Sequence, residues 1–295
     1  MACVPFVGLS IAPQVVRIVI MEIGRPSRTA MAVAQARAYH QLADEPRVFT
    51  DPFAIPIVGE SALEKGDFDL GLDPDLVRRR RLLIAARSRF ADDTVAAAIA
   101  KGTRQVVVLG AGLDTCAYRN THPDVRFFEV DHPDTQQWKR HRLAEAGIAV
   151  PPTLTFVPVD FETSTLTEGL AAAGFDRTCV TVFLLLGVVM YLTRPSIADT
   201  WLYIAGQGSG SVLVMDYLYP VARASSQSMD ERAKRVAAVG EPWLSSFTAD
   251  EVRGALVSSG FAEVEDCSAA VLLSRYLGGT VTGPMNSAIV RATVA

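Results

Sequence analysis

The sequence is poor in the residues that usually build metal sites and disulfides. Its four cysteines and four histidines are scattered, and none shows a CxxC or another metal-ligand spacing. No metal site is therefore predicted. Cys116 and Cys179 lie inside apolar segments, which predicts buried, reduced thiols. Reduced thiols are typical of the cytoplasm, so a cytoplasmic protein is expected.

The sequence also lacks an excess of basic charge and an uninterrupted apolar run. The net charge is -4 and the pI about 5.6, so no nucleic-acid partner is expected. Residues 1–23 are apolar, but Pro5, Pro13 and Arg17 interrupt them and no basic region precedes them, so no membrane partner is predicted. We interpret these residues as an N-terminal extension ahead of a conventional start at Met21. A lipid-surface segment is the alternative interpretation.

The strongest pattern that the sequence does contain is the stretch 105–119. Residues 106–109 are apolar and mostly β-branched, which predicts a strand buried on both faces of a parallel sheet. Gly110 and Gly112 allow a sharp turn and a close approach to a ligand. The residues that follow, from Asp114, are expected to begin a helix whose free N–H groups face that ligand. The turn either binds a cofactor or is a tight strand-helix junction without a ligand.

Two further predicted strands end in acidic residues. Asp131 ends the strand 125–131 about 20 residues beyond the glycine turn, where nucleotide-binding α/β folds place a carboxylate on the ribose. Asp160 ends the strand 154–161 in the same way. Asp131 could instead be a surface acid or a helix cap. Thr115 occupies the position of the third glycine of a dinucleotide fingerprint, which disfavours NAD and leaves room for S-adenosylmethionine.

Several motifs along the chain together resemble one family. They are SRTA at 27–30, TDPFA at 50–54, ARSRFADD at 86–93, VVVLGAGLDTCAYR, FFEVDHPDTQQWKR, FVPVDF, LGVVMYL, GEPW at 240–243 and SRYL at 274–277. From residue 27 to the C-terminus the chain resembles the leucine carboxyl methyltransferase superfamily, including its bacterial polyketide-type branch. The resemblance implies an α/β fold with a Rossmann-like, seven-stranded, mostly parallel sheet, helices on both faces, an N-terminal helical extension and a helical lid insert.

The remaining patterns complete this plan as a single methyltransferase domain over residues 24–295. Cap helices are expected within 24–100 and a lid insert at 220–245, after the strand 211–217. The four arginines at 78–81 are interpreted as a solvated helix face with ion pairs. Further helices are predicted at 28–43, 133–146, 163–174, 195–207 and 248–260, and further strands at 180–186, 262–270 and 286–294, the last two joined by a glycine-rich turn at 278–279.

Cofactor contacts are assigned from these motifs. By resemblance, Arg87 aligns with an arginine that contacts the methionine carboxylate of S-adenosylmethionine, and a guanidinium suits that partner. Arg89 could serve instead. The complete expected set is Arg87, Gly110, Ala111, Gly112, Asp131, Asp160 and Phe161.

The chain departs from the family at Leu186. The family pattern has a glutamate there, which approaches the amino group of the cofactor's methionine. Leucine cannot accept a hydrogen bond from an ammonium group. Cofactor binding is therefore weaker, or another carboxylate or carbonyl makes the contact, or methyl transfer has been lost.

The predicted function is methyl transfer from S-adenosylmethionine to an oxygen, most simply the carboxylate of a small aromatic or polyketide-like acid. A carboxylate is already ionised at neutral pH, so in-line positioning replaces a general base. Tyr191 and Arg28 are the candidates for orienting the acceptor. Tyr191 could instead be a packed aromatic, and Arg28 could form a helix-start ion pair. The alternatives are a catalytically silent cofactor-binding or interaction protein, which Leu186 favours, and a nicotinamide oxidoreductase.

Overall fold

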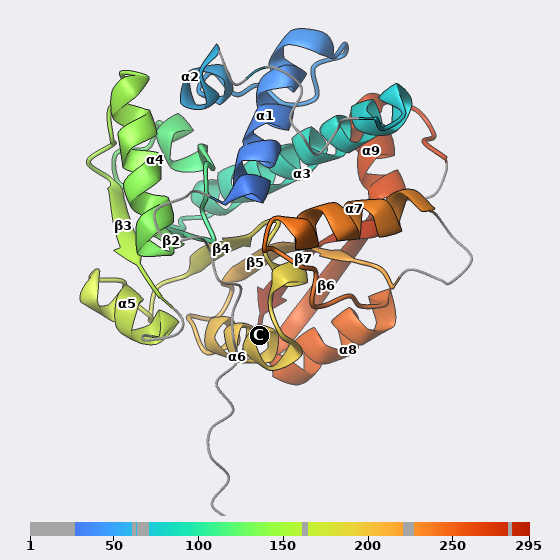
Figure 1. Cartoon of the computed structure of the whole chain (residues 1–295). Helices are drawn as coiled ribbons and strands as arrows, with labels where there is room; N and C mark the ends of the chain where they lie inside the picture. The colour runs from blue at the N-terminus through green and yellow to red at the C-terminus, as the bar shows by residue number, and fades with distance from the viewer. Residues whose placement is uncertain (1–26, 61–62, 64–70, 161–164, 221–226, 283–284) are drawn as a thin grey trace, which may run out of the picture.

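The computed structural model describes residues 27–60, 63, 71–160, 165–220, 227–282 and 285–295 (Figure 1). The expected extension at 1–23 and the expected cofactor contact Phe161 lie outside these described residues. Among the helices of the described part, none is both long enough and apolar enough to cross a bilayer.

A seven-stranded sheet forms the centre of the molecule, and its order is β3-β2-β1-β4-β5-β7-β6. The first five strands pair in parallel, whereas β7 is antiparallel to both β5 and β6. The prediction of a seven-stranded, mostly parallel sheet is therefore confirmed. The strands are β1 Gln105–Leu109, β2 Arg126–Asp131, β3 Leu154–Pro158, β4 Thr181–Leu185, β5 Val212–Leu218, β6 Phe261–Ser268 and β7 Ser287–Val294.

Helices cover both faces of the sheet, because alternate residues of its central strands are apolar on opposite sides. Val106 and Val108 of β1 pack into one hydrophobic cluster, and Val107 and Leu109 pack into the other. The first cluster holds α3 Pro74–Ala100, α4 Pro133–Glu145 and α9 Ala269–Leu277, and the second holds α5 Leu166–Ala172, α6 Arg194–Ala205 and α8 Ala249–Ser259.

Three further helices lie around this core. Figure 1 shows α1 Arg28–Ala43 against α3, α2 Ala54–Val58 beside α1, and α7 Gln227–Ala238 crossing in front of the sheet. Helix α1 contacts both α2 and α3, which ties the N-terminal helices to the sheet. The predicted helices at 28–43 and within 220–245 are thus present.

Side chains cap the starts of several of these helices. Thr248 and Glu251 form the capping box of α8, in which each side chain accepts a hydrogen bond from the other residue's backbone N–H. Thr193 caps α6, with a proline in its first turn. His132 caps α4 by accepting from the Asp134 N–H.

The segment after the glycine turn is different from the prediction. Residues Cys116–Arg119 form a short 3-10 helix, η2, and no α-helix begins at Asp114. The Asp114 side chain accepts from the Cys116 N–H, and the Asn120 side chain accepts from the His122 N–H, so side chains redirect the backbone into turns. The free N–H groups of a helix N-terminus are therefore not what faces the cavity here.

Two smaller expectations were also wrong. Strand β6 ends at Ser268, whose side chain accepts from the Val271 N–H and begins α9. The closing strands are therefore joined through this helix, and Gly278 ends it in a left-handed conformation. Cys179 is exposed because it lies in the turn before β4, whereas Cys116 is buried as expected.

Candidate active site

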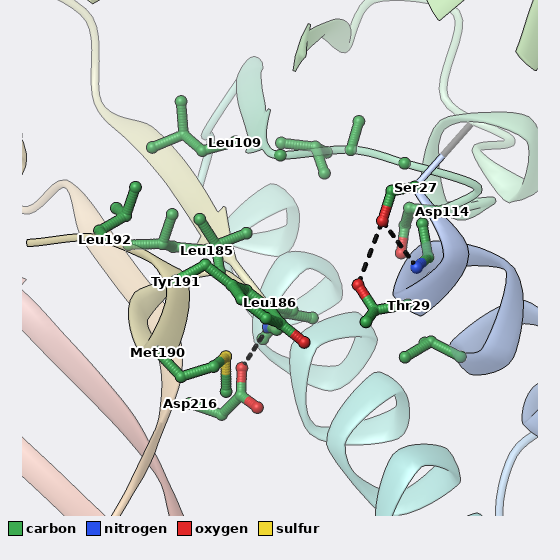
Figure 2. Close-up of a pocket in the computed structure, with 18 of the residues that line it drawn as sticks. Ser27, Thr29, Leu109, Asp114, Leu185, Leu186, Met190, Tyr191, Leu192 and Asp216 are labelled. Carbon is green, nitrogen blue, oxygen red and sulfur yellow. Dashed lines mark hydrogen bonds between the residues drawn. The ribbon is translucent and has the colours of Figure 1, made fainter. Parts of the chain in front are cut away.

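A cavity of about 990 Å³ opens at the carboxyl ends of the parallel strands. The loops after β1, β2, β3 and β4 form one wall, while α1, α3 and the segment after α7 contribute others. In Figure 2, Leu186, Tyr191 and Asp216 lie across the cavity from Ser27, Thr29 and Asp114. Acidic side chains outnumber arginines among its described lining residues, namely Asp114, Asp131, Asp134, Asp160, Asp199, Asp216 and Glu241 against Arg37, Arg80, Arg87 and Arg232.

The glycine loop after β1 has a backbone that other residues rarely adopt. Gly110 has φ +64 and Gly112 has φ +47, both in the left-handed region. A Cβ at Gly110 would lie 2.5 Å from the Val188 Cγ2 atom. The N–H groups of Gly110 and Ala111 donate to the Val130 carbonyl, at 2.8 and 3.1 Å. The loop is thus wedged between β2 and the segment that follows β4.

Asp131 fixes the middle of this loop. Its carboxylate accepts from the Gly112 N–H at 2.5 Å and from the His132 N–H at 2.7 Å. Burial raises the pKa of the Asp131 carboxyl, and these two hydrogen bonds oppose that change. Strand β2 therefore ends in an acid at the rim of the cavity, as the sequence predicted. Each oxygen of that carboxylate accepts from one backbone N–H group.

Arg37 of α1 is a cavity residue that sequence reasoning missed. Its side chain is buried, donates to the Leu113 carbonyl, and lies 3.6 Å from the Asp114 carboxylate and 3.7 Å from that of Asp51. Burial acts to raise the pKa of Asp114, but Arg37 and neighbouring cations hold it below its usual value. The available signal was the position of Arg37 three residues after Ala34, on the apolar stripe of the helix.

Arg87 lines the cavity, and its partner is a carboxylate of the neighbouring strand. Its Nη1 atom donates to Asp216 Oδ2 at 2.7 Å, and Asp216 Oδ1 accepts from the Gly187 N–H at 2.5 Å. Arg89, the alternative, pairs with Asp93 and is absent from the described cavity lining. The register thus places Arg87, and not Arg89, on the cavity side of α3.

Leu186 also lines the cavity, beside that same carboxylate. Leu185 of β4 pairs with Met215 of β5, so Leu186 and Asp216 occupy the next positions on neighbouring strands. Leu186, one residue beyond the end of β4, is therefore level with an acid of the neighbouring strand β5. The side chain of Asp216 is 11% exposed, at the surface of the cavity.

The remaining expected site residues are distributed unevenly. Tyr191, in the 3-10 helix η3 Val189–Tyr191, and Asp160, two residues beyond the end of β3, both line the cavity. Arg28 is exposed and is not among the described lining residues, although its backbone N–H donates to Glu241. The lining also includes Gly110, Ala111, Gly112 and Asp131, so the structure brings together every described member of the expected cofactor set.

The segment after α7 joins the two sides of the cavity. Glu241 accepts from the Arg28 N–H at 3.0 Å and from the hydroxyl groups of Ser27 and Thr29, all at the start of α1. Three residues further on, the Leu244 N–H donates to the Met190 carbonyl at 2.7 Å. A negative side chain at a helix N-terminus is electrostatically favourable. Residues 241–245, which we call the strap, therefore connect α1 to η3.

Comparison with known proteins relates this geometry to one family. The family model described as leucine carboxyl methyltransferase matches residues 30–205. The chain is 33% identical over 280 residues to YktD of Bacillus subtilis (strain 168), a proposed S-adenosyl-L-methionine-dependent methyltransferase, covering 84% of this chain and 90% of the relative. A second relative with the same description, from Mycolicibacterium gilvum (strain PYR-GCK), is 35% identical over 224 residues, with 69% and 72% covered.

Two solved structures share the fold. A duf574 family protein from Streptomyces avermitilis has a TM-score of 0.57 and 16% sequence identity, covering 89% of this chain and 97% of that one. A proposed methyltransferase from Thermobifida fusca has the same TM-score and identity, with 92% and 96% covered.

Proposed function

This chain belongs to the leucine carboxyl methyltransferase family and is an S-adenosylmethionine-dependent methyltransferase. On that premise we propose that it transfers the methyl group to a carboxylate oxygen of a small organic acid. The observation that carries the proposal is the cavity itself. Its volume of about 990 Å³ is at the upper end of the range for one drug-sized ligand, which leaves room for the cofactor together with a small acceptor.

The cofactor would lie along the carboxyl ends of β1, β2 and β4. Asp131 is suited to the ribose hydroxyls, and the glycine loop lets the ligand approach the backbone closely. Arg87 and Asp216 would hold the methionine end, because a guanidinium beside a carboxylate complements the carboxylate and ammonium of an amino acid. In this assignment Asp216 takes the place of the family acid that is missing at Leu186.

The acceptor would occupy the apolar part of the cavity, whose described side chains include Leu83, Met190, Leu218, Trp243 and Leu272. Tyr191 is proposed to orient the acceptor, since it lines this space. The exposed side chain of Arg28 supports an acceptor role less well.

The chemistry would be a direct displacement at carbon. A lone pair on the carboxylate oxygen forms the new bond to the methyl carbon while the carbon-sulfur bond breaks, so the sulfonium becomes a neutral thioether. No proton moves, and no general base is needed. Among the described lining residues there is no lysine, and the one histidine, His132, accepts from the Asp134 N–H at 3.3 Å. The protein would contribute alignment of the two reactants and exclusion of water.

We expect the methylated product to be labile in alkali. When the protein is incubated with methyl-tritiated S-adenosylmethionine and a panel of aromatic and polyketide-like acids, mild base should release the label as volatile methanol, because a methyl ester is hydrolysed under those conditions. Ether and amine products would keep the label. A stable methylated product would overturn the carboxylate assignment, and binding of the cofactor without turnover of any acid would favour the catalytically silent alternative.

The domain organisation follows the same proposal. Residues 24–295 would act as one methyltransferase domain in which the N-terminal helices cap the cavity and the insert 220–245 closes it. The contacts of the strap with α1 and η3 support a closing role for this insert.

Replacement of Glu241 by glutamine should loosen the strap. The variant loses a negative charge at the start of α1, worth about 0.3–1 kcal/mol. It also has one acceptor oxygen in place of the two that accept from the Arg28 N–H and from the Ser27 and Thr29 hydroxyls. We expect the KM for the acceptor to rise about 3- to 10-fold while the Kd for S-adenosylhomocysteine changes less than about 2-fold. Asp250→Asn, an equal charge change at the exposed start of α8, is the matched control. An unchanged acceptor KM would contradict the role of the strap.

A further inference from the structure

A buried ion pair lies beneath the cofactor loop, and the mechanism above does not use it. Glu129 in the middle of β2 and Lys139 in α4 are each 1% exposed. The Lys139 Nζ atom donates to Glu129 Oε2 at 2.7 Å. Burial raises the pKa of Glu129 to about 7, and the ammonium group of Lys139 opposes that change.

The stability of the folded protein does not by itself explain why two charged side chains are buried beneath the loop. The desolvation of a buried ion pair offsets most of its Coulomb attraction, and well-packed apolar side chains are often as stable or more stable. The pair should therefore be judged by what else it contacts.

The other contact of Lys139 is with the loop that faces the cavity. Its Nζ atom donates to the Asp114 backbone carbonyl at 2.7 Å, two residues after Gly112. Asp114 lines the cavity, and its N–H donates back to the Ala111 carbonyl at 2.7 Å. Lys139 thus anchors the far end of the loop, while Asp131 anchors its middle through the Gly112 N–H.

The ring of Tyr118 closes the other side of the ammonium group. The Nζ atom lies 5.3 Å from the centre of that ring, within the range of a cation–π contact. With a carboxylate, a carbonyl and a ring around it, the ammonium group has one defined position. The carbonyl that it holds is therefore fixed as well.

We propose that Lys139 is a positioning residue for cofactor binding, which holds the loop 110–114 in its binding conformation through the Asp114 carbonyl. Glu129 has a separate role, because its carboxylate offsets part of the desolvation cost of the buried Lys139 ammonium group. The proposal depends on binding of S-adenosylmethionine and is independent of the acceptor.

Two single substitutions separate positioning from stability, because both break the ion pair and only one removes the bond to the loop. Glu129→Gln keeps the Lys139 donor for Asp114, whereas Lys139→Met removes it. We expect both variants to melt at lower temperature. The Kd for S-adenosylhomocysteine, measured by calorimetry or by the ligand-induced melting shift, should stay within about 3-fold of the parent in Glu129→Gln. It should rise about 10-fold or more in Lys139→Met.

The double variant Lys139→Met/Glu129→Gln removes the buried charges and provides the test if Lys139→Met alone does not fold. It should recover much of the melting temperature and still bind S-adenosylhomocysteine about 10-fold more weakly. Gln105→Leu, which breaks a buried polar contact with Thr181 at the opposite end of β1, should lower stability without changing the Kd. Parental affinity in the double variant, or equal losses in both single variants, would overturn the proposal. Failure of the parent to bind would instead count against the proposed cofactor.

Discussion

Asp131→Asn is expected to weaken binding of S-adenosylhomocysteine by about 100-fold or more. Both carboxylate oxygens of Asp131 accept from backbone N–H groups, those of Gly112 and His132. An asparagine turns one acceptor into a donor, which then faces another donor. A hydrogen bond to a charged group contributes about 1.5–3 kcal/mol, and the proposed ribose contact is weakened at the same time. Calorimetric titration measures the change.

The control for this substitution is Asp199→Asn. Asp199 lines the same cavity from the exposed face of α6, so its replacement removes the same charge without touching the glycine loop. We expect a change of less than about 3-fold in the control, because exposed charges are screened by water and salt. Similar losses in the two variants would mean that the overall potential of the cavity, and not the geometry of Asp131, governs binding.

Gly110→Ala should have an effect of similar size by a steric route. The residue has φ +64, where an L side chain costs about 1–2 kcal/mol, and the new methyl carbon would lie 2.5 Å from Val188 Cγ2. Either the loop moves away from Val188 or the segment after β4 moves, and both line the cavity. We expect a lower melting temperature together with an affinity for S-adenosylhomocysteine about 100-fold lower.

Gly102→Ala separates backbone strain from the contact with Val188. Gly102 also has a positive φ, +103, but a Cβ there meets no atom within 4 Å and the residue does not line the cavity. The Gly102→Ala variant should have a lower melting temperature and an unchanged affinity for S-adenosylhomocysteine. The double variant Gly110→Ala/Val188→Ala should regain part of the lost affinity. If it regains none, the strain at φ +64 rather than the clash is responsible.

The sequence predicted the sheet well because its strands carry local signals. The residues 106–109 are all apolar, and each of them is buried between two helical layers. The acid that ends β2 was identifiable because parallel strands place their carboxyl ends on one rim. The capping box at Thr248 was identifiable because both partners lie three residues apart.

The contacts that complete the cavity could not be predicted, because they join distant parts of the chain. Glu241 meets Thr29 across 212 residues, and Arg37 meets the Leu113 carbonyl across 76. The prediction of a helix from Asp114 was wrong for a different reason. The side chain of Asp114 accepts from the Cys116 N–H and so competes locally with helix formation. The spacing of residues in a motif shows neither contacts between distant parts of the chain nor local competition by a side chain.

The excess of carboxylates over arginines in the cavity wall has a consequence for the order of events. S-adenosylmethionine carries a sulfonium charge that its product lacks, so an acidic wall favours the reactant over the spent cofactor. The same wall repels an acid acceptor while the cavity is empty and tolerates it once the sulfonium is in place. Electrostatics alone thus favours a sequence in which the cofactor enters first and the proposed acid second. Transfer neutralises both the sulfonium and the carboxylate, so the demethylated cofactor loses its attraction to the acidic wall and the ester is no longer repelled by it.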